Sequence, residues 1–160
     1  MQQAKLILTL AIVLAAVAVL SCSPKTLQFE TDMRGSNEVP PVTTNAAGSV
    51  SFTLNADKTA MTFELEITSP IDSAVASHIH LGAAGANRSI VVTLWSGQQG
   101  MGYTGRLATG TITQPDIVGP LAGMTLSALA DSMDRGVLYV NVHTTAHPAG
   151  EIRGQLRVKP

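Results

Sequence analysis

The sequence predicts an all-β fold, a sandwich or barrel of seven or eight strands with one short helix. Polar and apolar residues alternate with a period of two through most of the chain, which is the pattern of strands with one buried face. The alternating runs are short, and turn residues separate them, as in β-sandwiches and barrels. Residues 27–160 suit a single domain, which at this size buries a core without disulfides.

The first expected elements are a strand, a loop and a hairpin. Residues 27–33 form the strand, and the loop at 35–41 contains two consecutive prolines, which a central strand does not tolerate. Residues 50–54 and 61–67 both alternate, and a turn at 55–58 joins them. We expect a β-hairpin with one buried face and one wet face.

The rest of the chain continues this pattern, with one exception. Between Leu121 and Met133 the apolar residues recur near helical spacing, and Gly136 follows, so this segment predicts the short helix, near Thr125 to Met133. The remaining expected strands are residues 75–81, 90–95, 107–113, 137–143 and 151–158, with glycine-rich loops at 82–87 and 98–105.

The N-terminus is typical of an export signal. One positive charge, Lys5, precedes an apolar run from Leu6 to Leu20. As a helix these residues would span roughly 22 Å, too short for a bilayer core of about 30 Å. The run ends in Val-Leu-Ser-Cys, which resembles the lipobox of bacterial lipoproteins. The resemblance implies cleavage before Cys22 and acylation of that cysteine, the alternative being an ordinary signal peptide with a chance cysteine.

The expected organisation is a lipoprotein signal peptide at 1–21, a tether with acylated Cys22 at 22–26, and one domain at 27–160. Such a protein is exported and held on a membrane by its acyl chains. Ser23 favours the outer membrane, by analogy with sorting in enterobacteria. Removing Lys5 changes the charged residues from 10 basic and 11 acidic to 9 and 11, so the mature chain is nearly neutral, and without a basic stripe nucleic acid is excluded as a partner.

Three of the four histidines lie in two expected strands. His78 and His80 are two residues apart, so both point away from the aliphatic face of their strand, and His143 likewise lies opposite the aliphatic face of the later strand. If these strands are neighbours, opposed β-carbons about 5 Å apart let the imidazoles converge on one ion. Imidazole suits copper and zinc. The alternative is chance placement on a wet face, and His147 is either a fourth ligand or a loop residue.

Two carboxylates and one arginine are further candidates. Glu151 and Arg153 share a face of the last strand. If that face adjoins the histidines, Glu151 orients a ring in the second coordination shell and Arg153 attracts anions. The alternative, slightly favoured, is a surface ion pair. Glu38 is expected to be a solvated loop carboxylate rather than a ligand.

Three motifs resemble those of the CHRD domain, a family first described in chordin and common in bacterial exported proteins. They are NEVPPV at 37–42, HIHLGAAGANRSIVVTL at 78–94 and GVLYVNVHTTAHPAGEIRGQL at 136–156. The motifs occur in order and extend over nearly the whole mature chain. The resemblance implies no single enzymatic activity.

The histidine pattern also resembles that of copper-zinc superoxide dismutase, a Greek-key β-barrel. His78 and His80 are similar to its first pair of copper ligands, and His143 to its late ligand. The chain lacks that family's zinc loop, bridging histidine and disulfide cysteines. The resemblance therefore implies an all-β Greek-key fold with a single three-histidine copper site.

These observations lead to three functional hypotheses. The first is a lipid-anchored binding domain, not an enzyme, that holds a copper-like ion at the cell envelope. The second is a metal-free interaction or adhesion module that contacts another envelope protein. The third is an oxidoreductase acting on superoxide, which an open copper position would support.

Overall fold

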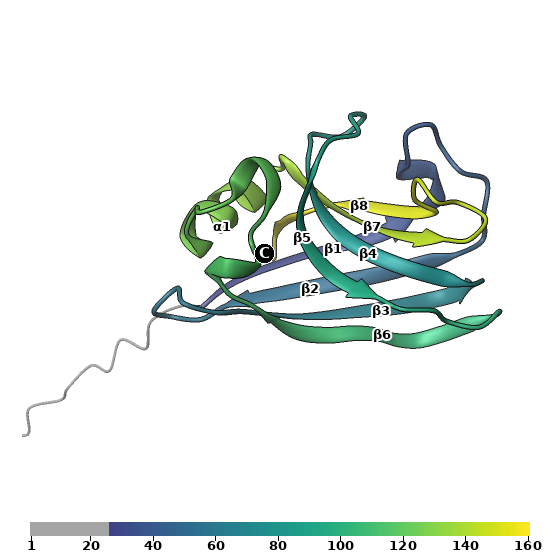
Figure 1. The fold of residues 1–160 in the computed structure, drawn as a ribbon, viewed down its shortest axis with the longest axis horizontal. Coiled ribbons are helices and arrows are strands. Elements are labelled where there is room, and N and C mark those ends of the chain that lie inside the picture. Colours follow the sequence, from purple (N-terminus) through teal and green to yellow (C-terminus); the bar gives the residue numbers. More distant parts are fainter. Residues whose placement is uncertain (1–25) are drawn as a thin grey trace, which may run out of the picture.

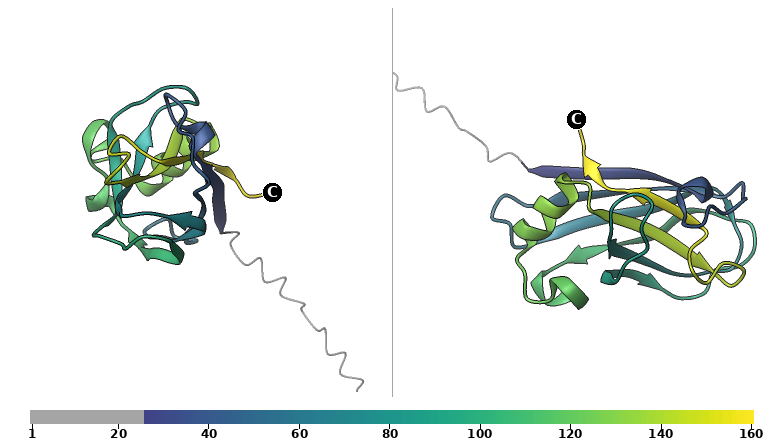
Figure 2. Two further views of the ribbon diagram at one scale, coloured as in Figure 1. Left: turned by 90° about the vertical axis from the view of Figure 1, so that its right-hand side faces the viewer. Right: turned by 90° about the horizontal axis from the view of Figure 1, so that it is seen from above.

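The computed structural model describes residues 26–160, which form a nearly closed β-barrel with one helix at its end (Figures 1 and 2). The signal peptide and Cys22, predicted above, lie outside the described residues. The strands are β1 (Leu27–Arg34), β2 (Ala47–Leu54), β3 (Met61–Ile71), β4 (Ala74–Leu81), β5 (Ile90–Ser96), β6 (Tyr103–Ile112), β7 (Leu138–Thr144), β8 (Ile152–Gln155) and β9 (Arg157–Val158). The helix α1 is Leu126–Asp134. The all-β prediction is confirmed.

The sheet follows the order β5-β4-β7-β8-β1-β2-β3-β6, with every pair antiparallel. The two outermost strands, β5 and β6, approach each other without pairing, which leaves the barrel open along one seam. Around the barrel, β4, β5 and β6 lie in chain order, and β3 lies on the far side of β6 although it precedes β4 in the sequence. This arrangement of four strands is a Greek key. Eight strands form the wall, in line with the predicted count, and the two-residue β9 pairs with β1 alone.

The core fills the barrel with the inward residues of the alternating strands. The hairpin of β2 and β3 is paired over its full length, with Phe52 opposite Phe63 and Val50 opposite Leu65, and all four side chains are buried. Apolar residues at every second position therefore meet across the strands, which is how the pattern fixes the register. Figure 2 shows the barrel from its end and from above.

Some strands differ in extent from the prediction, whereas the helix agrees with it to within one residue at each end. The strand expected from Leu107 begins at Tyr103, because the glycine-rich run pairs with β3 after a tight turn at Met101. The helix begins at Leu126, where the Thr125 side chain accepts a hydrogen bond from the Ala128 N–H and caps it. The last strand is interrupted at Leu156, which is buried in the core.

The helix packs at the end of the barrel at which β1 begins (Figure 1). Its buried side chains are Leu126, Leu129, Ala130, Ser132 and Met133. Within residues 26–160 there is no helix with the length and apolar character needed to cross a bilayer.

Candidate metal centre

The strands β4 and β7 are neighbours, as the histidine prediction required. They pair in a register that places His78 opposite Asn141 and His80 opposite Tyr139. His143 lies opposite Ala76, one step along the same face from His78. The alternate residues Ile79, Val140 and Val142 are fully buried in the core. The period-two interpretation of both strands is therefore confirmed, and all three imidazoles lie on the outer face of the barrel wall.

The three rings converge. Each offers a nitrogen, and no two of the three atoms are more than 4.8 Å apart. His78 Nδ1 and His143 Nε2 are separated by 3.0 Å, and the ring centroids lie between 4.9 and 6.0 Å from one another. Imidazole nitrogens about 2.0–2.1 Å from one tetrahedral ion would be roughly 3.4 Å apart.

Backbone carbonyls fix the tautomers of two rings. His80 Nδ1 donates to the Arg88 carbonyl at 2.9 Å, and His143 Nδ1 donates to the Pro148 carbonyl at 3.0 Å. A carbonyl oxygen can only accept, so each ring carries its proton on Nδ1 and has its lone pair on Nε2. His143 Nε2 accepts a hydrogen bond from His78 Nδ1. Within residues 26–160, His80 Nε2 is buried and has no hydrogen-bond partner. Partners of this kind orient metal-ligating histidines.

The environment keeps the rings neutral. Burial, together with the neighbouring rings of His143 and His80, lowers the pKa of His78 to about 4. Burial also lowers the pKa of His80 and of His143, although a hydrogen bond to a carbonyl opposes it in each case. Neutral imidazoles present lone pairs to a cation without first losing a proton.

Most of the outer face around the histidines is covered, which the sequence did not predict, and only His78 of the three is half-buried rather than nearly buried. Every residue of β7 is buried, on both faces of the strand. The loops at 35–46 and 82–89 pass over this part of the wall, and the Asn87 side chain donates to the Val39 carbonyl to join them. This outward face is largely buried rather than wet, because segments distant in sequence replace the solvent.

Arg153 lies in this covered layer and is 1% exposed. Its guanidinium donates to Asn87 Oδ1 and to the carbonyls of Ala83 and Ala86, at 3.0–3.1 Å. Its Cζ is 3.4 Å from the ring centroid of Tyr139. The Tyr139 ring stacks in parallel on His80, with centroids 4.8 Å apart. Tyr139 therefore lies between the Arg153 guanidinium and the metal centre.

Glu151 is placed elsewhere. Its carboxylate accepts hydrogen bonds from the hydroxyls of Thr44 and Thr144, at 2.7 and 2.8 Å. It thereby ties the covering loop to the end of β7. The surface ion pair with Arg153 is wrong, because both residues are buried and have other partners. The contacts described for Glu151 include no histidine ring.

Two site residues were missed. Glu38 is 5% exposed rather than solvated, and Asn141 is 2% exposed. Burial raises the pKa of Glu38 to about 7, against Arg153 and Asn141, which lower it. Gly150, at φ +126°, makes room for both, because a Cβ there would overlap Glu38 Oε1 and Asn141 Nδ2. The parity argument that placed the histidines also puts Asn141 on their face, so it was available from the sequence.

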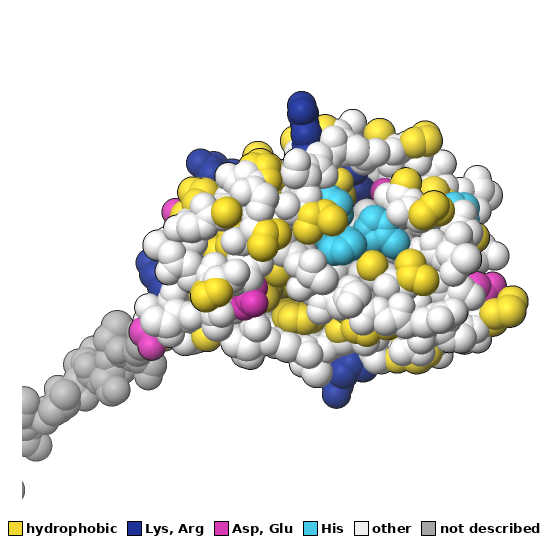
Figure 3. All heavy atoms as spheres, viewed as in Figure 1, with side chains coloured by type: hydrophobic (Ala, Val, Ile, Leu, Met, Phe, Trp, Pro, Cys, Tyr) yellow, Lys and Arg dark blue, Asp and Glu magenta, His cyan; other side chains and the backbone are white. Residues whose placement is uncertain are grey.

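His147 is outside the cluster. In the described chain the candidate metal group consists of His78, His80 and His143. His147 instead lines a pocket of about 240 Å³ together with Glu38 and three prolines. Figure 3 shows histidine side chains gathered at the surface of the face that Figure 1 presents, so the centre is open to solutes.

Comparison with known proteins gives one match. No curated protein and no solved structure matches the chain. The model of the CHRD domain matches residues 29–156, which extends from β1 to the end of the last core strand and includes all three histidines. The chain therefore belongs to the CHRD domain family.

Proposed function

We propose that this CHRD domain is a metal-binding module that holds one copper ion through His78, His80 and His143. The observation that carries the proposal is the convergence of three neutral imidazoles, two of which direct an Nε2 lone pair into the cluster because their tautomers are fixed. The buried, unpartnered His80 Nε2 supports it, since a buried acceptor without a donor costs about 1–3 kcal/mol unless something binds it.

The donor set favours copper over other ions. It consists of imidazole nitrogens alone, and such sites bind divalent copper more tightly than divalent zinc, cobalt or nickel. Zinc is the second choice. His78 would supply Nδ1 once the hydrogen bond to His143 Nε2 opens, which requires its proton to move to Nε2 or to leave.

The position of the centre favours handling of the ion over permanent storage. His78 is only half-buried, and the histidine cluster reaches the surface (Figure 3). An ion held there has an open coordination position that a second molecule reaches directly. We propose that the module binds and exchanges copper at the cell envelope, where the first 22 residues predict it to be anchored.

Metal titration of the purified full-length chain tests the proposal. Cu(I) and Cu(II) are each titrated, with a competing chelator, into the wild type and into a variant with all three histidines changed to alanine. We expect one tightly bound equivalent in the wild type and more than a 100-fold loss of affinity in the variant. Loss of a second-shell partner alone costs about 10–100-fold.

His147→Ala is the matched control, because this histidine lies outside the cluster. It should leave the affinity unchanged. Equal affinity of the wild type and the triple variant would contradict the proposal and would leave the interaction module as the remaining hypothesis.

A further inference from the structure

A row of three polar side chains leads from His80 through Asn141 to Glu38, and each holds a buried acceptor atom without a partner in residues 26–160. The atoms are His80 Nε2, Asn141 Oδ1 and Glu38 Oε1, and in residues 26–160 they are the buried side-chain nitrogen and oxygen atoms that lack a hydrogen bond. Unsatisfied buried acceptors are rare in folded proteins. Three adjoining acceptors would be satisfied by added hydrogen-bond donors or by a cation.

The Asn141 amide is the middle member of the row. It lies beside the Glu38 carboxyl on one side and beside His80 on the other. Its Nδ2 and Glu38 Oε1 crowd the same space above Gly150, so the carboxyl and the amide are packed together. The Asn141 Oδ1 is thereby left toward the imidazole.

One proton satisfies all three acceptors when no ion is bound. An amide offers an acceptor and two donors, and turning it by 180° exchanges them. If Glu38 is protonated, its O–H donates to Asn141 Oδ1, and Asn141 Nδ2 donates to His80 Nε2. Each of the three atoms then takes part in a hydrogen bond, without any movement of the backbone.

A metal ion reverses this arrangement. The ion occupies the His80 Nε2 lone pair, so an N–H of Asn141 can no longer point there. The amide oxygen turns toward the positive charge, and Nδ2 turns toward Glu38. A carboxylate accepts that donor better than a neutral carboxyl does.

We propose that Glu38 carries a proton in the metal-free protein and releases it to solvent when the ion binds, with the Asn141 amide turning over between the two states. This inference rests on the proposed function. The pocket that Glu38 shares with His147 gives the proton a route out.

The electrostatics of the surroundings agree with this exchange. The groups that face Glu38 are the Arg153 guanidinium from β8, the Asn141 amide from β7 and the backbone N–H of Val39. Burial nevertheless raises the pKa of Glu38 to about 7, so its carboxyl is mostly protonated at pH 6. An added cation lowers that pKa. The pKa values of the three histidines are lowered, that of His78 to about 4, so the imidazoles are neutral at pH 6.

Infrared difference spectroscopy of the full-length chain at pH 6 tests the proposal, with Cu(I) as the probe. Cu(I) avoids the acidic bound water that a divalent ion brings. In the wild type, binding should remove the C=O stretch of one protonated carboxyl and produce a carboxylate band. Glu38→Gln should bind Cu(I) without that change. Glu151→Gln, which alters a buried carboxylate already paired with two hydroxyls, should keep it.

A measurement without any variant gives an independent check. At pH 8.5 Glu38 is already ionised, so the same titration of the wild type should show no loss of a protonated carboxyl. Cu(I) binding at pH 6 with an unchanged carboxyl band, or an identical band change in Glu38→Gln, would overturn this inference and leave the proposed function intact. Absence of both Cu(I) and Cu(II) binding in the wild type would overturn both.

Discussion

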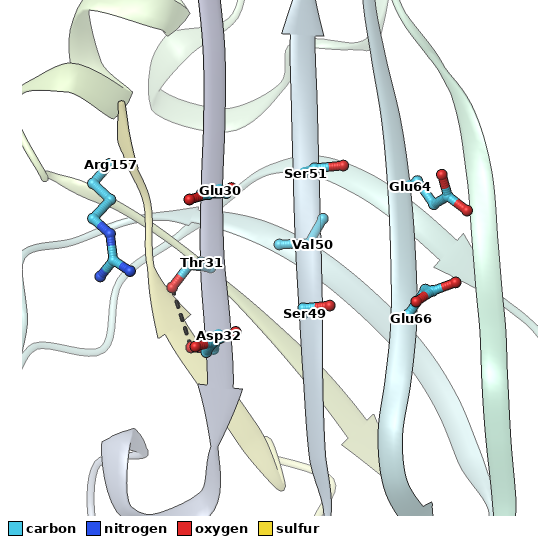
Figure 4. A pocket seen from close by; sticks show the side chains of 9 residues that line it. All are labelled: Glu30, Thr31, Asp32, Ser49, Val50, Ser51, Glu64, Glu66 and Arg157. Atoms are coloured by element: carbon cyan, nitrogen blue, oxygen red, sulfur yellow. Dashed lines mark hydrogen bonds between the residues drawn. The ribbon is translucent and has the colours of Figure 1, made fainter. Parts of the chain in front are cut away.

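Two regions of the outer wall start from the same alternating pattern and reach opposite environments. On β1, β2 and β3 the outward residues include Glu30, Asp32, Glu64 and Glu66, which line a shallow open pocket of about 340 Å³ together with two serines (Figure 4). On β4, β7 and β8 the outward residues include the three histidines, of which His78 is half-buried, and Asn141 and Arg153, which lie buried under loops.

The charged groups of the two regions behave accordingly. Arg106 pairs with Glu64 on the open face, and its side chain is 60% exposed, whereas Arg153 is 1% exposed. The open carboxylates are hydrated, while the covered polar groups depend on specific protein partners. The difference shows that alternation decides which way a side chain points, and that the loops decide whether it can titrate, bind a metal or do neither.

Replacing one arginine in each region should give the largest contrast. Arg153→Met removes the donor for three acceptors in the covering loop, so we expect a loss of about 3 kcal/mol or more in the free energy of unfolding. Arg106→Met breaks an exposed ion pair and should cost about 0–1 kcal/mol. Chemical denaturation measures both. Similar losses in the two variants would mean that the covering layer is not what distinguishes the regions.

Two glycines sharpen the comparison at an intermediate magnitude. Gly105, at φ +104°, has open space where a Cβ would lie, whereas a Cβ at Gly150 would overlap Glu38 and Asn141. Gly105→Ala should cost about 1 kcal/mol from its backbone conformation. Gly150→Ala should cost about 1–3 kcal/mol more, because it also overpacks the covered layer. Denaturation midpoints give the difference, and equal costs would show that the space above Glu38 is not tightly filled.

The pH dependence of stability should reveal a smaller effect. The pKa of Glu38 is about 7 in the folded chain against an ordinary 4.5, so between these values the native state holds a proton that the unfolded state has released. Stability therefore falls as the pH rises from 4.5 to 7. In metal-free protein the wild type should lose stability relative to Glu38→Gln across this window. A constant difference between the two would mean that Glu38 is ionised throughout.

The sequence predicted the directions of side chains well. Period two placed His78, His80 and His143 on the outer face, and the register of β4 and β7 brought them together. The same parity contains Asn141 and Tyr139, yet neither was identified, because polar residues on an outward face are ordinarily solvated.

The loops that cover this part of the wall could not be predicted. The buried Arg153 contacts the carbonyls of residues 83 and 86, the nearer of which is 67 positions away in the sequence. Glu38 lies against Gly150, which is 112 positions away. No local pattern specifies such contacts. The early start of β6 was not predicted for a related reason. A glycine-rich run shows no alternation, and it becomes a strand only by pairing with β3.

The course of β1 determines how far the metal centre lies from the start of the domain. The strand enters the barrel at Leu27 and reaches the level of the metal centre at Arg34, which pairs with Arg153. Seven residues of extended chain span about 23 Å. If Cys22 carries the proposed lipid, the three imidazoles lie well above the bilayer surface and face the aqueous compartment. The molecule that delivers or receives the ion would then be a water-soluble one.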